Sequence, residues 1–441
     1  MAVTRVLISI EWFRLLIFHK MKKSISCLFL MLLFSVIFSI SVKAENNVII
    51  SSISTNGNDG DDEYHINDVI VETVDGVEMG FIVTCLSPKT VQFGGSKCQA
   101  FNLGSGINQE TSGKVRIPSE VRGFQVTRIA GGAFFWCENV TEIEIPETII
   151  EIEENAFYCC AGLKSLHIPA SVEIIEGART FWRLAEIESI TVADENKYYS
   201  CPPGSNCLIE NATGTLLLGC KNSVIPNSVR IIGPSSFSHQ KGINSIDIPE
   251  GVNTIGDAAF YATGLRRVGL PNSLTTIESI AFGCCFSLNQ VNLPQSLEYI
   301  GDGAFHNCIL LGSIIIPAKV NYIEQDAFLY CPLKEIISLR PEPIEISDKA
   351  FVYDYDDDEV LDYRTQDNAT LYVPIGSKEK YEHAAGWKLF KNIEEMDFSA
   401  INSVLKEKED DEMYYNLSGL RLQSIPNKGL YIYNGKKLYA K

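Results

Sequence analysis

Hydrophobic residues recur along most of the chain with a period of about 23 residues. A phenylalanine marks each unit: it follows a small or short residue, and neighbouring copies are 22 to 24 residues apart, except across one gap of 56. Prolines that follow Ile or Leu keep the same period, from Pro118 to Pro317. Repetition at a fixed period predicts a solenoid, in which each unit packs on its neighbours. The anchor phenylalanines are Phe134, Phe157, Phe181, Phe237, Phe260, Phe282, Phe305, Phe328 and Phe351.

Within one unit, the alternation of apolar and polar residues predicts two short extended stretches. In residues 163–177 (LKSLHIPASVEIIEG), Leu166 and Ile168 alternate with polar residues and so share one face of a strand. Pro169 ends that strand because it has no N–H to donate. A second extended stretch follows, and the segment with the next Phe is expected to form one helical turn. We therefore predict a mainly β repeat solenoid, with a parallel sheet on one face and short helical turns on the other.

The repeated phrase resembles the BspA-like leucine-rich repeat family of bacterial cell-surface and secreted proteins. The pattern is clearest in residues 293–305 (LPQSLEYIGDGAF) and 248–260 (IPEGVNTIGDAAF). Residues 114–134 and 371–393 resemble the family's entry into the repeats and its C-terminal cap. The resemblance implies leucine-rich repeats over residues 114–351 and a binding protein at the cell surface.

Four further segments are predicted around the repeats. Residues 45–113 are β-rich with Gly turns and predict an N-terminal cap, and residues 352–398 predict a C-terminal cap. Residues 190–220 carry turn residues between β-rich runs, which predicts an irregular hairpin insertion. This hairpin is either a structural elaboration or a binding loop. Residues 399–441 read as a linker and a small β-hairpin tail, with its turn at Asn434-Gly435.

The first 44 residues predict a secretory signal peptide. Lys22 and Lys23 precede an apolar run over residues 25–40, and small residues end the segment at Ala44. Met21 is an alternative translation start. In that case residues 1–20 do not belong to the protein. A membrane anchor is the alternative interpretation, although the run is short for a span of ~20 residues. We expect the protein to be exported, and either secreted or held at the cell surface.

Charge narrows the range of partners. The whole chain carries −18, and residues 1–44 carry +5, which leaves −23 on the remainder. Such a surface repels nucleic acid and anionic lipid. Acidic runs at residues 56–63 and 353–359 could offer oxygen ligands to calcium, but neither has the spacing of a known calcium loop. We therefore interpret them as solvated loops, and expect no metal or cofactor.

Twelve of the 13 cysteines lie beyond the signal segment, and several follow the repeat. We predict a ladder of small buried thiols, while disulfides between neighbouring coils remain the alternative, since coil spacing permits them. Better disulfide candidates are Cys201 with Cys207, and Cys85 with Cys98. The ladder cysteines, three residues after an anchor Phe, are Cys137, Cys160, Cys285, Cys308 and Cys331.

No catalytic or zinc-binding motif is recognisable in the sequence. CxxC, HExxH, GxSxG, the P-loop and the Rossmann glycine pattern are all missing. An enzyme would have to assemble its site from scattered residues. We expect a non-catalytic protein, with an uncharacterised hydrolase as the weakest alternative.

The outward positions of the predicted strands form a candidate binding face. Its residues are small, polar and mixed in sign, and lack the aromatic anchors typical of binding hot spots. We predict that it binds an extracellular protein; a solvated sheet is the alternative. A glycan-binding protein would instead use exposed tyrosines, for which Tyr198, Tyr199, Tyr353 and Tyr355 are candidates. The face comprises Glu142, Glu144, Ser165, His167, Ser245, Asp247, Arg267, Gln290, Asn292 and Ser313, with Gly269 and Ile315 at equivalent positions.

Overall fold

The computed structural model describes residues 64–95, 105–351 and 365–398, and the backbone of four short strands between residues 414 and 440. The predicted signal segment, both acidic runs and Cys98 lie outside the described residues. Within the described ranges, no helix combines the length and the apolar character needed to cross a membrane.

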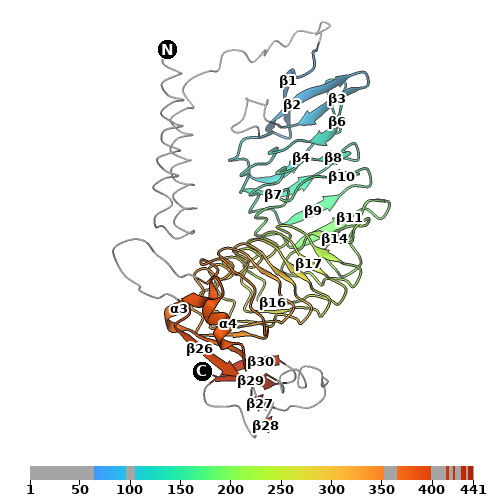
Figure 1. The fold of residues 1–441 in the computed structure, drawn as a ribbon. Helices are drawn as coiled ribbons and strands as arrows, with labels where there is room; N and C mark the ends of the chain where they lie inside the picture. The colour runs from blue at the N-terminus through green and yellow to red at the C-terminus, as the bar shows by residue number, and fades with distance from the viewer. Residues whose placement is uncertain are drawn as a thin grey trace, which may run out of the picture. The chain divides into compact units, whose positions relative to one another are not determined.

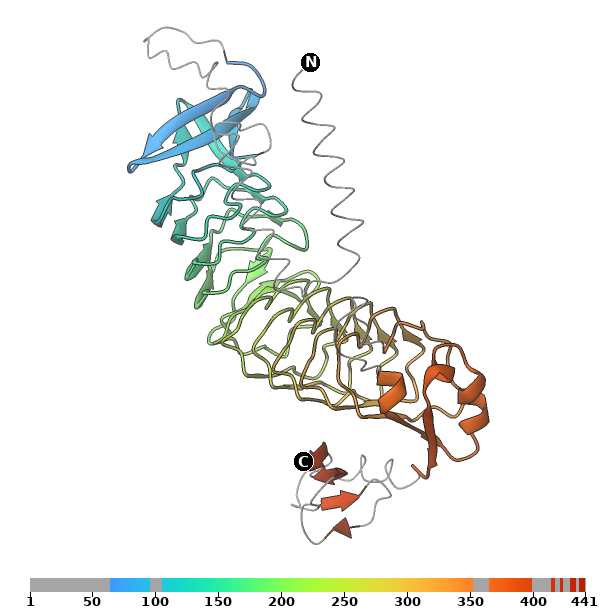
Figure 2. The ribbon, with the colours of Figure 1, turned by 90° about the vertical axis from the view of Figure 1, so that its left-hand side faces the viewer.

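The predicted repeat solenoid is confirmed, and its coils stack through two parallel ladders of strands rather than one (Figures 1 and 2). The first ladder contains the strands that, in most coils, precede the repeat proline. It forms three separate sheets: β4 (Gly113–Arg116), β7 (Val140–Glu144), β9 (Ser165–Ile168) and β11 (Ser189–Val192); β16 (Ser245–Asp247), β18 (Arg267–Gly269) and β20 (Gln290–Val291); and β22 (Ser313–Ile316), β24 (Glu335–Ser338), β25 (Thr370–Pro374) and β26 (Asn392–Met396).

The second ladder contains the short strands, mostly of two residues, that follow each repeat proline. Neighbouring strands pair in parallel within each of two sheets, and the ladder is interrupted between residues 175 and 231. The second residue of each two-residue strand from residue 231 onwards is buried in the core. The strands of this ladder are β6 (Phe124–Ile129), β8 (Glu151–Ile152) and β10 (Ile174–Ile175), with β5 (Glu120–Val121) against β6, and then β15 (Ile231–Ile232), β17 (Thr254–Ile255), β19 (Thr276–Ile277), β21 (Tyr299–Ile300) and β23 (Tyr322–Ile323).

The segment around each anchor Phe is a run of tight turns, and the predicted helical turn is wrong. In the coil of Phe157, the Cys160 N–H donates to the Phe157 carbonyl at 3.2 Å, a bond between residues three apart. Asn155 and Cys159 adopt left-handed backbone angles, with φ of 62° and 61°. A right-handed helix cannot contain such residues without breaking. The turns instead give their N–H groups to the next coil.

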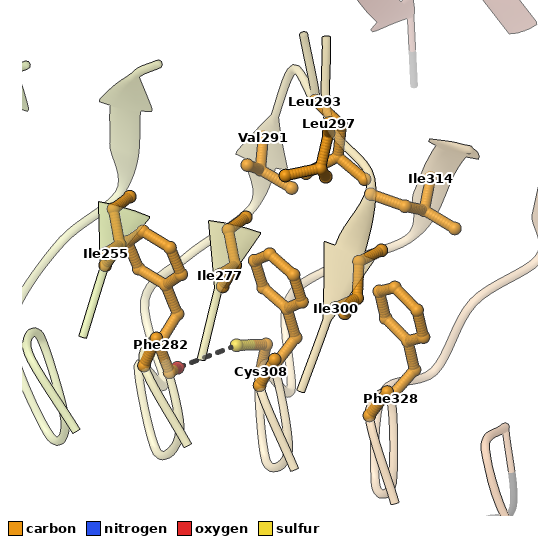
Figure 3. Packing of buried hydrophobic residues seen from close by; sticks show 14 of the residues in the cluster. Ile255, Ile277, Phe282, Val291, Leu293, Leu297, Ile300, Cys308, Ile314 and Phe328 are labelled. Atoms are coloured by element: carbon orange, nitrogen blue, oxygen red, sulfur yellow. Dashed lines mark hydrogen bonds between the residues drawn. The ribbon is translucent and has the colours of Figure 1, made fainter. Parts of the chain in front are cut away.

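The anchor phenylalanines stack face to face through the core. From Phe237 to Phe351, consecutive ring centroids lie 5.0–5.4 Å apart and the ring planes differ by 2–8°. Figure 3 shows Phe282 and Phe328 beside the inward isoleucines of the second ladder, such as Ile277. Each ring thus fills the space between two coils. A first stack contains Phe134, Phe157 and Phe181.

The predicted cysteine ladder is confirmed as a row of buried free thiols. Each thiol from the second coil onwards donates to the carbonyl of the anchor Phe one coil earlier; Cys308 Sγ lies 3.3 Å from the Phe282 oxygen (Figure 3). Burial raises the pKa of Cys285 to about 11. The ladder therefore adds a hydrogen bond between coils as well as apolar contact. The equivalent bonds are made by Cys160, Cys285 and Cys331.

The predicted disulfide between Cys201 and Cys207 is not formed. Both are free thiols, because they point to different backbone carbonyls: Cys201 donates to Ile190 and Cys207 to Ser205, each at 3.2 Å. Cys85 is also a free thiol, and its predicted partner lies outside the described residues.

Residues 190–220 interrupt the regular coils. Strands β12 (Tyr199–Ser200), β13 (Leu208–Glu210) and β14 (Thr215–Leu218) pair antiparallel, and β14 then pairs in parallel with β15. The Phe stack stops at Phe181 and resumes at Phe237. Gly219 packs against the Phe237 ring, and a Cβ added at residue 219 would lie 2.1 Å from a ring carbon. The inserted segment therefore divides the core into two clusters of buried residues.

Other elements lie before and after the coils. The N-terminal strands β1 (Val69–Val74), β2 (Val77–Leu86) and β3 (Lys89–Phe93) are antiparallel, and β3 pairs in parallel with β6. After the coils, α3 (Thr365–Asn368), α4 (Lys378–His383) and η2 (Trp387–Leu389) accompany β25 and β26. The tail forms β27 (Tyr414–Asn416), β28 (Arg421–Leu422), β29 (Gly429–Tyr433) and β30 (Lys436–Ala440), and the last two flank the predicted hairpin turn.

Candidate functional site

The structure distributes the predicted binding face over three sheets, so the expectation of one continuous row is wrong. The side chains do point away from the core, and are exposed or half-buried. The inserted hairpin separates the first sheet from the second, and strands β20 and β22 share no ladder in the described chain. Glu142, Glu144, Ser165 and His167 lie on the first sheet; Ser245, Asp247, Arg267 and Gln290 on the second, with Asn292 just beyond β20; and Ser313 on the third.

The first sheet carries the most developed polar surface. Lys114 Nζ lies 3.0 Å from Glu142 Oε1 and 3.1 Å from Glu144 Oε2. Hydrogen bonds to these two carboxylates raise the pKa of Lys114. On the neighbouring strands, His167 Nδ1 lies 2.9 Å from Thr191 Oγ1. We call this surface the N-terminal face: Lys114, Glu142, Glu144, Ser165, His167 and Thr191.

A hollow of about 220 Å³ lies in the N-terminal face. Its lining offers two carboxylates, two hydroxyls and an imidazole, in addition to the edges of Ile143 and Leu166. These groups suit hydrogen bonds and ion pairs to a polypeptide. The parallel register fixes their spacing, since Glu142 pairs with Ser165 and His167 with Thr191. Each coil therefore presents a different polar group at the same position along its strand.

Sequence reasoning missed Lys114 and Thr191. Both occupy the outward offset that identified Glu142 and His167, in the phrases KVRIP (114–118) and SITVA (189–193). Carrying that offset one coil further in each direction would have found them.

The second and third sheets are less suited to binding. On the second sheet, the parallel register aligns Ser245, Arg267 and Gln290. Asp247 Oδ1 fills the space beside Gly269, because a Cβ added at residue 269 would lie 2.6 Å from that oxygen. On the third, the outward surface is covered by a small apolar cluster. Ile315, which was expected to face solvent, is half-buried there. The cluster contains Ile315, Ile337, Leu339, Tyr372, Met396 and Phe398.

Only one of the described tyrosine candidates for glycan binding faces solvent. Tyr198 is 45% exposed. Tyr199 is buried, and its hydroxyl accepts a hydrogen bond from the Ile175 N–H at 2.7 Å, which corrects its assignment to an exposed loop. Tyr353 and Tyr355 lie outside the described residues.

A second hollow, of about 470 Å³, lies on the second ladder. Asp257, Glu278 and Tyr299 line it, together with Thr276 and Ser279. Glu278 accepts the Asp257 N–H at 3.0 Å, and burial raises the pKa of the Asp257 carboxyl. Beside it, the Tyr299 ring centroid is 6.2 Å from that of the exposed Tyr322.

An outer aromatic row runs beside the buried Phe stack and was not predicted. The residue after the anchor Phe is Phe, Tyr or Trp in four of the nine units and His in a fifth, a pattern visible in the sequence. Trp182 spans the interruption of the core, since its ring lies 5.5 Å from that of Tyr261. The outer aromatic row comprises Phe135, Tyr158, Trp182, Tyr261 and His306. In the described ranges, no three His, Cys, Asp or Glu side chains are grouped to hold a metal ion.

Comparison with known proteins gives a family match. The pattern described as a BspA-type leucine-rich repeat region matches residues 113–214 and 218–354 in six copies, more than half of the chain. No curated protein matches the chain.

Several solved structures are similar to this chain. A leucine-rich cell-surface protein of Faecalibacterium prausnitzii is 24% identical over 66% of this chain, which spans 62% of that protein, with a TM-score of 0.40. The pneumococcal vaccine antigen PcpA is 17% identical over 76% of this chain and 100% of that protein, with a TM-score of 0.43. A leucine-rich repeat protein of Eubacterium ventriosum is 18% identical, covering 64% and 88% of the two chains, with a TM-score of 0.42.

Proposed function

Because the chain belongs to the BspA-type leucine-rich repeat family, we propose that it is a non-catalytic exported protein that binds an extracellular macromolecule in the manner of an adhesin. It acts at the cell surface or in secreted form. The observation that carries this proposal is the N-terminal face, where parallel strands hold polar groups in register around a hollow. Repeat solenoids commonly use such extended faces to bind proteins.

The favoured partner is a protein segment that carries Lys or Arg. Lys114 is more than half exposed and bridges Glu142 and Glu144. A cation from a partner can replace or join it on the two carboxylates. Because exposed ion pairs are individually weak, affinity must come from several contacts along the face.

Binding to an array tests the proposal directly. The full chain would be incubated with extracellular-matrix proteins, mucins and glycans, with an unrelated acidic solenoid as control. Selective retention of a protein ligand is expected. Retention no different from that of the control solenoid would contradict the proposal.

Reversal of a charge on the face should then weaken protein binding. We expect Glu144→Lys to lower affinity about tenfold, because it removes one carboxylate and repels the partner's cation. The matched control is Glu147→Lys, which makes the same charge change at an exposed residue outside the strands. Equal losses in Glu144→Lys and Glu147→Lys would mean that net charge, rather than the face, governs binding. Affinities would be measured by biolayer interferometry at two salt concentrations.

A glycan ligand is the second candidate, favoured by the hollow beside Tyr299. Aromatic rings stack on sugar rings, and the Asp257 and Glu278 carboxylates can accept hydrogen bonds from sugar hydroxyls. If the array retains a glycan, Tyr322→Ala should lower its affinity at least tenfold, while Tyr198→Ala should leave it unchanged. The reverse pattern would place the glycan on the inserted hairpin instead.

A further inference from the structure

One coil of the outer aromatic row lacks a side chain. Gly283 stands where the neighbouring coils carry Tyr261 and His306. The gap lets these two rings, two coils apart, approach to a centroid distance of 6.2 Å. A Cβ at residue 283 would lie 2.7 Å from His306 Nδ1, so this approach requires glycine. The next residue, Cys284, reaches both rings.

The Cys284 thiol is surrounded by polar groups. Its Sγ lies 3.4 Å from Tyr261 Oη and 3.5 Å from His306 Nε2, and Asn307 Nδ2 lies 3.8 Å away. His306 Nδ1 is 3.2 Å from the Gly303 carbonyl, which can only accept a hydrogen bond. Nδ1 therefore carries the ring proton, and Nε2 is left to accept the thiol proton. A nucleophile next to an oriented base has this arrangement.

Cys159 provides a comparison within the same molecule. It occupies the same repeat position, with φ of 61° against 56° for Cys284. The two residues are almost equally buried, at 2% and 3% exposed. Burial raises the pKa of Cys159 to about 12, although Arg183 opposes this shift. Cys159 therefore has the position and burial of Cys284 without an imidazole partner.

The ladder cysteines differ from Cys284 as well. Cys285, next in the chain, donates to a backbone carbonyl, which cannot take a proton. Among the described cysteines, Cys284 alone has a hydrogen bond to a histidine. A thiol that can pass its proton to an imidazole gains thiolate character, and the thiolate is the reactive form.

We propose that Cys284 and His306 form a reactive thiol site that exchanges with small disulfides. His306 Nε2 takes the thiol proton, and the Cys284 thiolate attacks one sulfur of the disulfide. A new S–S bond to Cys284 forms as the original S–S bond breaks. The leaving thiolate then takes the proton from the imidazolium, and the disulfide itself is the oxidant. This site is independent of the proposed binding function.

The low exposure of Cys284 restricts the co-substrate to small, uncharged disulfides.

The test compares two thiols in one sample. The full chain would be treated with hydroxyethyl disulfide near neutral pH, quenched in acid and digested, and the mixed disulfides quantified by peptide mass spectrometry. We expect Cys284 to react at least tenfold faster than Cys159. In the variant His306→Gln, the rate at Cys284 should fall to within about twofold of the rate at Cys159. Unmodified Cys285 and Cys308 would show that each sample remains folded.

Two results would overturn the proposal. The first is an equal rate at Cys284 and Cys159 in the unaltered chain, a comparison that needs no variant and so does not depend on whether His306→Gln folds. The second is an unchanged rate at Cys284 when His306 is replaced and the ladder thiols remain protected.

Discussion

Replacement of Phe282 by alanine is expected to lower the free energy of unfolding by about 4 kcal/mol. The ring is fully buried and stacks on Phe260 and Phe305 at 5.3 Å on both sides. Truncation removes its burial and leaves a cavity between two coils that the parallel ladders hold at a fixed spacing. The coils cannot close the gap without breaking hydrogen bonds of both ladders. Chemical denaturation monitored by circular dichroism measures the change.

The matched control lies four residues away. Phe286 is 37% exposed, so Phe286→Ala should cost about 1 kcal/mol or less. A loss of under 1 kcal/mol for Phe282→Ala, or equal losses in the two variants, would show that the Phe stack does not hold the coils together. Because cooperativity in solenoids passes between neighbours, the transition is also expected to broaden.

Acidification should destabilise the protein through His239. Burial is the main cause that lowers the pKa of His239 to about 3, and the positive charges of Arg183 and Lys241 add to it. Its Nδ1 has no hydrogen-bond partner among the described residues, and Trp182 and Tyr261 pack against the ring. The side chain is therefore neutral in the folded state and is held without a carboxylate that could accept a charge.

The sign follows from the direction of this shift. Below its ordinary pKa of about 6.5, the histidine binds a proton in the unfolded chain but stays neutral in the folded chain. Acid therefore stabilises the unfolded state. The free energy of unfolding carries no penalty from His239 above about pH 7. It falls as the pH falls from 7 towards 3. Between about pH 7.5 and 4.5, we expect a loss of about 2.5 kcal/mol from this residue.

The variant His239→Phe isolates that contribution from other titrating groups. The difference in unfolding free energy between the variant and the unaltered protein should shift by about 2.5 kcal/mol in favour of the variant over this pH range. A difference that stays constant with pH would contradict the assignment. Denaturation curves at several pH values provide the measurement.

The repeat period predicted which residues of each coil are buried and which are exposed, because these features depend on the sequence of one unit. Leu166 and Ile168 are buried as their alternation required, and Ser165 and His167 point outward. The cysteine ladder followed from the same argument, because a position that is buried in one coil is buried in the next. Such inferences need only the sequence of one unit and the fact of repetition.

Contacts between coils could not be predicted in this way. The residues around Phe157 allow a helical turn, but the Phe157 N–H donates to the Thr180 carbonyl of the next coil at 3.1 Å, and this bond favours open turns. The separation of the predicted face into three sheets depends on the path of residues 190–220. The proximity of Cys284 and His306 depends on the missing side chain at Gly283. Each of these features depends on contacts with residues of other coils, which the sequence of one unit does not specify.

The exchange of hydrogen bonds between consecutive coils has a genetic consequence. The Phe282 carbonyl receives a thiol from the next coil, and the Phe282 N–H donates to Ala304 of that same coil. A tandem duplication of one 23-residue unit would supply a new coil with the same donors and acceptors, about 4.8 Å further along the stack. Both ends would keep their contacts. Recombination between repeats can thus lengthen or shorten this gene by whole units, and selection can adjust the reach of the protein without rebuilding its core.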